Sequence, residues 1–101
     1  MLTWSTDNAF AAGSAHEGPG DGITARGIEA LHIMERLGML VDVSHASEKT
    51  FWDIVSHTEK PFIASHSNAW SLCPAKRNLK DDQIRAIAER GGVIGMNAWG
   101  S

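Results

Sequence analysis

The chain has 101 residues, a formal net charge of −3 and 43% hydrophobic residues, a composition typical of one globular unit and not of a disordered or fibrous chain. Its few basic residues are scattered, which argues against nucleic acid as a partner, because a phosphate-binding face needs clustered Lys and Arg. The apolar stretches are about as long as a strand, well short of the ~20 residues of a membrane span, and no signal peptide is evident; the cellular location stays open.

The first half of the chain predicts a loop, a helix and a strand. Residues 1–4 are interpreted as the remnant of a strand, and residues 5–22 as a loop rich in Gly, Ala, Ser and Asp. An amphipathic helix is predicted over residues 23–37, because apolar side chains recur at helical spacing, and Gly38 follows as its stop. An apolar strand is then predicted over residues 39–45.

The second half continues the alternation. Ser47 is the predicted N-cap of a helix that fades near His57, and a second apolar strand is predicted over residues 61–66. A loop leads to a third helix over residues 81–90, which begins with two aspartates at the positive end of the helix dipole and stops at a Gly-Gly pair. Residues 93–96 are predicted to form one more buried strand.

This order, roughly βαβαβαβ with short crossovers, predicts an α/β fold with a parallel sheet. A complete (β/α)8 barrel needs ~250 residues, so these units amount to about half of one, and the chain is interpreted as a single partial domain over residues 1–101. A five-stranded flavodoxin-like fold is the alternative architecture. The barrel is favoured because two of the predicted strands end on the same dipeptide.

That dipeptide is Ser-His, at Ser44-His45 and at Ser65-His66. Parallel neighbouring strands place their carboxyl ends on one edge of the sheet, where α/β proteins build their sites. Two imidazoles that converge at such an edge indicate a metal ion. A lone histidine at a strand end is more often structural, but two in matched positions, with one helix between them, favour His45 and His66 as metal ligands.

Other polar and aromatic residues receive more ordinary interpretations. Asp42 is read as structural, because strand alternation turns it away from the faces of its neighbours. Residues 18–22 are read as a flexible turn, because they lack the Lys-Ser or Lys-Thr of a phosphate-binding loop. Trp70 is interpreted as core or surface cover, with a pocket wall as the alternative, and Cys73 as a packed thiol. Three further histidines are interpreted as solvated: His16, His32 and His57.

Four segments together resemble consecutive motifs of the membrane dipeptidase family (renal dipeptidase, peptidase M19). They are GITARG at 22–27, LGMLVDVSH at 37–45, ASHSN at 64–68 and RNLKDDQI at 77–84. The resemblance extends from about residue 2 to residue 97. Each motif is weak alone, but their order and spacing are specific together.

The resemblance implies a zinc-dependent dipeptidase on an amidohydrolase-type (β/α)8 barrel, with two zinc ions and a metal-activated hydroxide as nucleophile. By similarity, His45 and His66 ligate one of the two ions. Arg77 aligns with an arginine that the family uses at the substrate, and its guanidinium suits the free carboxylate of a dipeptide; Asn8 is a second candidate for substrate binding. From the residues alone, Arg77 pairs instead with an aspartate of the following helix. The resemblance also implies that the complete enzyme can form a homodimer.

The sequence departs from the family in two ways. Trp4 stands after Leu-Thr where many members have a histidine, which leaves an oxyanion contact in question, although an indole N–H can donate a hydrogen bond. The family's other ligands have no counterpart here, and two imidazoles are too few for a catalytic zinc site, so these residues are expected to be an inactive piece of an enzyme, whose catalytic acid or base stays unidentified. The alternatives are a non-catalytic α/β module that self-associates and another amidohydrolase-type metal hydrolase.

Overall fold

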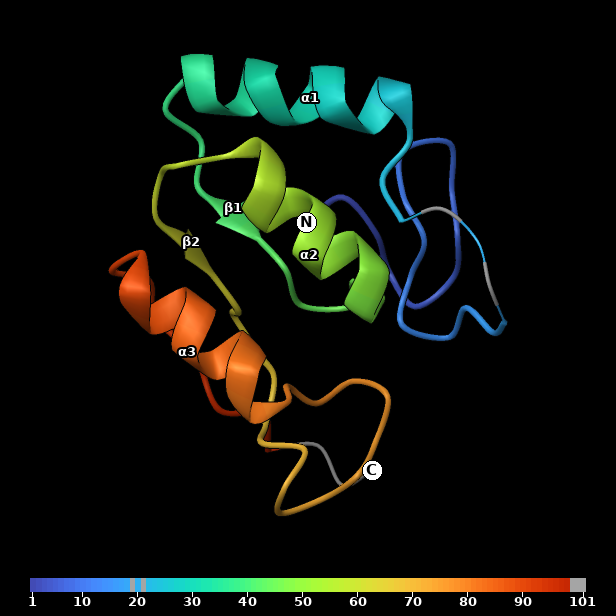
Figure 1. Ribbon diagram of the computed structural model, residues 1–101, viewed down its shortest axis with the longest axis vertical. Coiled ribbons are helices and arrows are strands. Elements are labelled where there is room, and N and C mark those ends of the chain that lie inside the picture. Colours follow the sequence, from blue (N-terminus) through green and yellow to red (C-terminus); the bar gives the residue numbers. More distant parts are fainter. Residues whose placement is uncertain (19, 21, 99–101) are drawn as a thin grey trace.

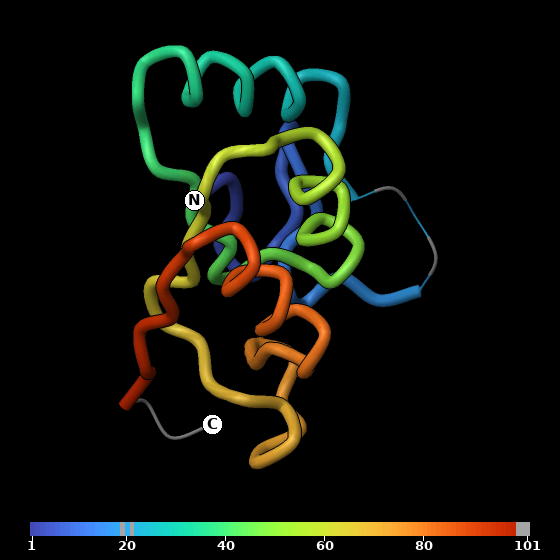
Figure 2. The backbone as a smooth tube through the Cα atoms, turned by 60° about the vertical axis from the view of Figure 1, so that its left-hand side comes forward, coloured from blue at the N-terminus to red at the C-terminus, as the bar shows by residue number. Residues whose placement is uncertain are grey.

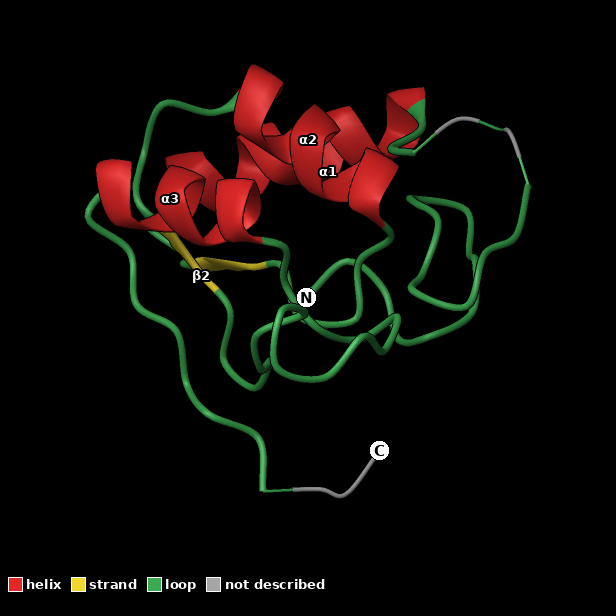
Figure 3. Ribbon diagram, turned by 60° about the horizontal axis from the view of Figure 1, so that its bottom comes forward, coloured by secondary structure: helices red, strands yellow, loops and turns green. Residues whose placement is uncertain are grey.

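The computed structural model describes residues 1–18, 20 and 22–98 of the chain. Three helices alternate with two short parallel strands (Figure 1), in the order α1 (Ala25–Arg36), β1 (Val41–Asp42), α2 (Glu48–His57), β2 (Phe62–Ile63) and α3 (Asp81–Glu89). The helices gather on one side of the strands, and the long loops occupy the other side (Figure 3). The prediction of an α/β fold with parallel pairing is therefore confirmed.

The sheet is built around β2. Val41 of β1 pairs with Phe62, and Asp42 pairs with Ile63, in parallel register. On the other side of β2, Ala64 forms a parallel bridge with Ile94, and the Gly95 N–H donates to the Ala64 carbonyl at 2.8 Å. This pairing brings the last described segment alongside the segment that follows β2 (Figure 2).

The strands are shorter than predicted. β1 and β2 have two residues each. Residues 93–96 pair with the segment after β2 through an isolated bridge and do not form a strand. The interpretation of residues 1–4 as a strand is wrong, because no backbone ladder involves them within the part of the chain that the structure describes. Instead, the Thr3 hydroxyl donates to the His45 carbonyl at 3.0 Å, so this segment is held by a side chain.

Local sequence signals set the bounds of α1. The Thr24 side chain caps the helix by accepting from the Gly27 N–H, and the chain leaves it at Gly38, whose φ of +75° favours glycine. Leu31, in the middle of α1, is fully buried. The predicted helix over residues 23–37 is confirmed, with slightly narrower bounds.

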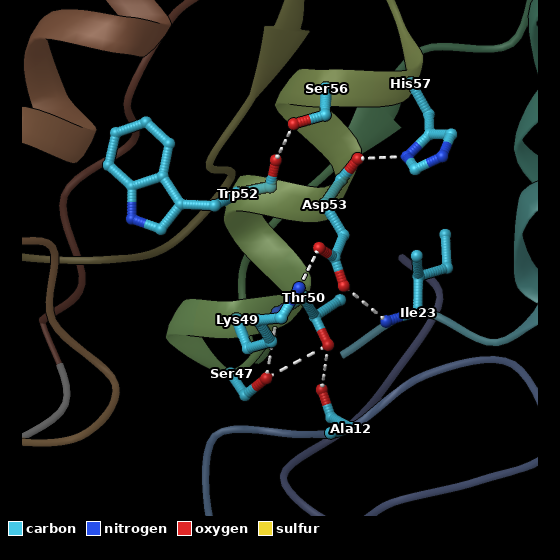
Figure 4. A network of polar contacts seen from close by, with 9 residues as sticks. All are labelled: Ala12, Ile23, Ser47, Lys49, Thr50, Trp52, Asp53, Ser56 and His57. Carbon is cyan, nitrogen blue, oxygen red and sulfur yellow. Dashed lines mark hydrogen bonds and ion pairs between the residues drawn. The ribbon is translucent and has the colours of Figure 1, made fainter. Parts of the chain in front are cut away.

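α2 is tied to the N-terminal loop by its first turns (Figure 4). Ser47 caps the helix, and Thr50 donates its hydroxyl to the Ala12 carbonyl at 2.9 Å. One turn later, Asp53 accepts the backbone N–H of Ile23 at 3.0 Å and forms an ion pair with Lys49. These contacts fix the position of the N-terminal loop, part of which returns to the site described below.

The hydrophobic core lies between the helices and the strands. Phe51 of α2 and Phe62 of β2 are almost completely buried and meet edge to face, with ring centroids 5.7 Å apart. Ile87 of α3 is also buried, and Arg90 joins α3 to α2 by donating to the Val55 carbonyl at 2.9 Å. None of the described helices is both long enough and apolar enough to cross a membrane.

Candidate metal centre

The two Ser-His dipeptides lie side by side because they occupy equivalent positions after paired strands. Asp42 and Ile63 are register partners, and His45 and His66 each follow their strand partner by three residues. The predicted convergence of the two imidazoles at the carboxyl edge of the sheet is therefore present. It follows directly from the parallel register of β1 and β2.

The ring nitrogens of the two histidines face each other. Their Nε2 atoms are 3.0 Å apart, and the ring centroids are 4.9 Å apart at an interplanar angle of 59°. Each Nδ1 atom contacts a serine hydroxyl, that of Ser5 at 3.0 Å for His45 and that of Ser65 at 2.8 Å for His66. Each Nδ1 thus has a serine partner, and the two Nε2 atoms lie within hydrogen-bond distance of each other.

His45 adopts an unusual backbone conformation to reach this position. Its φ of 69° is the only positive value at a non-glycine residue within the described chain, and such a conformation costs about 1–2 kcal/mol. The His45 carbonyl accepts from the Thr3 hydroxyl at 3.0 Å and from the Ser14 N–H at 2.8 Å. The N-terminal segment therefore holds His45 in a conformation that the sequence does not favour locally.

Buried hydroxyl groups link the two histidine loops. The Ser44 hydroxyl accepts the His66 N–H at 3.0 Å and lies 3.1 Å from the hydroxyl of Ser67. Both serines are only 1% exposed, so the two hydroxyls satisfy polar groups that water does not reach. This network sets the spacing of the two loops beneath the imidazoles.

Asp42 fastens the two loops together from the strand side. Its Oδ1 accepts backbone N–H groups of Ser44 and Ser65, both at 3.0 Å, and its Oδ2 accepts the Ser65 hydroxyl. Burial opposes ionisation of Asp42, but these donors outweigh it and hold the pKa of the carboxyl below its usual value. The contacts agree with the structural role predicted for Asp42.

Burial and nearby positive charge keep His45 neutral. Burial is the largest cause, followed by the charges of Arg77 and of His66, and together they lower the pKa of His45 from 6.5 to about 4. A neutral imidazole is the form that ligates metal ions.

The pair fits a metal ion of the zinc type. Two nitrogens at zinc–imidazole bond lengths in a tetrahedral arrangement lie about 3.3 Å apart, close to the observed 3.0 Å. No third His, Cys, Asp or Glu joins them within the described residues. Two imidazoles are fewer than the three protein ligands of a typical catalytic zinc site, and metal binding by His45 and His66 stays a prediction.

Trp4 forms a wall of the site. Its indole stacks on the His45 ring with centroids 3.8 Å apart and planes 21° apart, while 63% of the residue stays exposed. Close packing positions this segment, because a side chain at Gly13 would collide with the backbone of Trp4 and Ser5. The sequence interpretation of Trp4 considered only hydrogen bonding. Its stacking on His45 depends on a tertiary contact with a residue 41 positions away in sequence.

A cavity of about 470 Å³ opens beside the two imidazoles. Its lining is mostly polar or aromatic: Trp4, Ser5, His45, His66, Asn68, Arg77, Asn78 and Asn97. The Arg77 guanidinium donates to the His66 carbonyl at 2.8 Å and lies 3.5 Å from the Ser67 hydroxyl. No carboxylate forms an ion pair with Arg77 among the described residues, so the alternative of a surface pair with Asp81 or Asp82 is not observed.

Asn8 lies outside this cavity. Its side-chain amide donates to the Leu2 carbonyl at 2.8 Å, and its side-chain oxygen accepts the N–H groups of Phe10 and Ala11. These contacts shape the N-terminal loop. Substrate binding by Asn8 stays a prediction that no contact in the structure supports.

The remaining histidines differ in their surroundings. His32 and His57 are exposed, as predicted. His16 is partly buried and pairs with Asp7, with Nδ1 and Oδ2 2.7 Å apart, so its interpretation as solvated is wrong. No spacing rule links residues on two turns of an irregular loop, which explains why the sequence did not indicate the pair.

The structure also bears on the interpretations of Trp70 and of residues 18–22. Trp70 lines a second cavity, of about 230 Å³, together with His16 and Lys76, which is the role considered as its alternative. The predicted flexible turn at residues 18–22 includes residues 19 and 21, which lie outside the described part of the chain.

Comparison with known sequences relates the chain to dipeptidases. The family model for membrane dipeptidase (peptidase family M19) matches residues 1–101. An uncharacterised protein of Klebsiella pneumoniae is 46% identical over 99 residues, which cover 93% of this chain and 36% of the relative. An uncharacterised dipeptidase of Schizosaccharomyces pombe is 43% identical over 101 residues, which cover 97% of this chain and 24% of the relative. The chain thus spans about a quarter to a third of these relatives.

Comparison with solved structures relates the fold to metallopeptidases. A metallopeptidase from Rhodobacter sphaeroides, liganded with a phosphinate mimic of the dipeptide L-Ala-D-Ala, superposes with a TM-score of 0.84 and 34% identity over 92% of this chain and 28% of that chain. The probable dipeptidase PvdM from Pseudomonas aeruginosa gives a TM-score of 0.85 and 30% identity, over 93% and 25% respectively. The predicted fold class is confirmed, since the chain matches part of an amidohydrolase-type (β/α)8 barrel.

Proposed function

The chain belongs to the membrane dipeptidase family, peptidase family M19, and we propose that the intact protein hydrolyses the peptide bond of dipeptides at a zinc centre to which His45 and His66 contribute. The observation that carries the proposal is the facing pair of Nε2 atoms, 3.0 Å apart beside a cavity that Trp4 and Arg77 also line. The dipeptide mimic in the Rhodobacter sphaeroides structure supports the substrate class.

In this proposal, the histidines and their serine partners have different roles at the site. His45 and His66 hold the ion, and their serine partners keep both rings oriented. A zinc ion held there would lower the pKa of a bound water to about 7, which is the chemistry that hydrolysis of a peptide bond at neutral pH needs. The resemblance to the family implies a second zinc ion, and no group of three or more His, Cys, Asp or Glu side chains that could hold an ion occurs among the residues described here.

Arg77 binds the substrate's terminal carboxylate. Its guanidinium lies on the cavity wall beside His66 and has no carboxylate partner within the described chain, so its charge is available to an anionic ligand. A planar guanidinium pairs with a carboxylate through two parallel hydrogen bonds. Such a contact selects substrates whose free carboxylate lies one residue beyond the scissile bond.

Trp4 closes one side of the same cavity. Its indole covers the face of His45 and presents apolar surface toward the substrate position. It thereby limits access of water to the ligand ring and offers a packing surface for a substrate side chain.

The proposal is tested on the intact protein after removal of metal. Addition of zinc should restore hydrolysis of L-Ala-L-Ala, and His66→Ala should abolish both the activity and the stoichiometric binding of zinc. His32→Ala is the matched control, because His32 is an exposed histidine on α1 that lies outside the cavity. Activity that survives chelation, or zinc binding that His66→Ala leaves unchanged, would refute the assignment.

A further inference from the structure

A chain of hydrogen bonds connects the carboxylate of Asp42 to one of the two imidazoles. The Ser65 hydroxyl donates to Asp42 Oδ2, and the same hydroxyl oxygen lies 2.8 Å from His66 Nδ1. His66 Nε2, on the other side of the ring, faces His45. We propose that Asp42, acting through the Ser65 hydroxyl, is a positioning residue that fixes the proton of His66 on Nδ1 and directs the Nε2 lone pair at the metal.

The direction of each hydrogen bond follows from the chemistry of the groups. An ionised carboxylate only accepts, so the single proton of the Ser65 hydroxyl goes to Asp42. The Ser65 oxygen is then the acceptor for His66, and Nδ1 must carry the hydrogen. In a neutral ring this leaves Nε2 without a proton, which is the form that binds a metal ion.

The carboxylate is itself held rigidly. Oδ1 of Asp42 accepts the N–H groups of Ser44 and Ser65, which precede His45 and His66 in the chain. One side chain at the end of β1 therefore fixes the start of both ligand loops as well as the proton of one ligand. Asp42 is only partly exposed, so water competes weakly for these bonds.

His45 lacks an equivalent arrangement. Its Nδ1 lies 3.0 Å from the Ser5 hydroxyl, and no described carboxylate contacts that hydroxyl. The Ser5 hydroxyl is free to donate or to accept, so it does not impose one proton position on His45. The two ligands are thus unequal, and His66 is the one whose proton position is set in advance.

This inference rests on the proposed metal centre, and its test uses the metal-free intact protein as well as zinc titration. Nitrogen-15 NMR of labelled histidine reports which ring nitrogen of His66 is protonated, and competition with a chromophoric chelator reports zinc affinity. We expect the Nδ1–H form in the wild type. Ser65→Ala and Asp42→Asn should each weaken zinc binding by roughly 10- to 100-fold, the usual effect of losing an outer partner of a ligand.

Asp42→Asn is the sharper variant because its amide can donate where the carboxylate accepts. A donated hydrogen at the Oδ2 position turns the Ser65 hydroxyl toward His66, and we expect the ring proton to move to Nε2. Ser65→Ala gives an independent result if Asp42→Asn does not fold. Ser65→Thr, which keeps the hydroxyl, should restore zinc affinity to within about twofold of the wild type.

The matched control is Ser56→Ala, which removes an exposed hydroxyl that bonds only to the Trp52 carbonyl in α2 (Figure 4). A wild-type His66 protonated on Nε2 would overturn the proposal, as would unchanged zinc affinity in both Ser65→Ala and Asp42→Asn. His66→Ala separates the two claims. If it binds zinc normally, the metal centre is refuted; if it loses zinc while both other variants keep it, only the role of Asp42 is refuted.

Discussion

Replacement of Arg77 by alanine gives the most direct measure of how the cavity recognises substrate. The guanidinium donates to the His66 carbonyl at 2.8 Å, and the rest of its N–H donors have no carboxylate acceptor among the described residues. Burial lowers the pKa of Arg77, with the charge of Asp42 acting in the opposite direction, so the cation is held in a partly desolvated place. An anionic ligand there gains more from pairing than it would in water.

The magnitude follows from the contacts that the variant removes. Hydrogen bonds to charged groups contribute about 1.5–3 kcal/mol, which corresponds to a roughly 10- to 150-fold loss in kcat/KM for a substrate with a free carboxylate. Arg77→Ala also removes the bond to the His66 carbonyl, which disturbs a ligand loop whatever the substrate. That second effect must be separated from the first.

A pair of substrates makes the separation. Steady-state kinetics of wild type and Arg77→Ala are measured with L-Ala-L-Ala and with its C-terminal amide, which lacks the negative charge. The loop disturbance affects both substrates and cancels in the ratio, so the roughly 10- to 150-fold loss should be confined to the free acid. Arg77→Lys should recover part of it, since it restores charge without the planar fork. Equal losses on the two substrates would refute the carboxylate contact.

Three further predictions concern the site and the core. The pKa of His45 is about 4 in the folded chain and about 6.5 in the unfolded chain, so the unfolded chain binds more protons between these pH values. Urea denaturation of the metal-free protein should therefore show a free energy of unfolding that falls from pH 6.5 to pH 4. In His45→Gln this free energy should depend less on pH. Trp4→Ala should weaken zinc binding by about 0.5–1.5 kcal/mol, and Trp4→Phe should weaken it by less, because phenylalanine can still stack on His45. If the two variants bind zinc with equal affinity, stacking of Trp4 does not contribute to zinc binding. Phe51→Ala should lower the free energy of unfolding by about 3–5 kcal/mol, because Phe51 is buried against Phe62. The control Ile33→Ala, at an exposed position, should lower it by less than about 0.5 kcal/mol. A small effect of Phe51→Ala would contradict the packing of α2 on β2.

The parts of the site that lie on regular elements were predictable from sequence. Apolar spacing and helix stops located the three described helices within a few residues. Ser47 was a predicted cap that the structure confirms, whereas the cap of α1, Thr24, lies inside the predicted helix. The facing of His45 and His66 followed from one assumption, that two apolar segments separated by one helix are parallel neighbours. That assumption holds because a short helical crossover permits little else.

The parts that depend on the N-terminal loop were not predictable. Residues 1–16 form no regular element, and they reach the site through single contacts, such as Thr3 to the His45 carbonyl and Trp4 to its ring. Neither contact follows a periodicity, because each joins residues about 40 positions apart. The left-handed conformation of His45 has the same origin, since it depends on acceptors and donors that only the folded loop supplies.

Most of the hydrogen bonds that position the two imidazoles relative to each other join residues between β1 and the end of the second histidine loop. Asp42 and Ser44 from the first loop bond to Ser65 and His66 of the second, and these bonds lie within one parallel β-α-β unit. The unit therefore supplies the bonds that join the two histidine loops to each other, while the N-terminal segment holds His45 and the Arg77 guanidinium holds the His66 carbonyl. In the proposed zinc centre, two imidazoles held in place in advance would lose little conformational freedom on binding an ion. We therefore expect substitutions at the β1–β2 loops to change zinc affinity directly, and substitutions in distant core positions to change it only through stability.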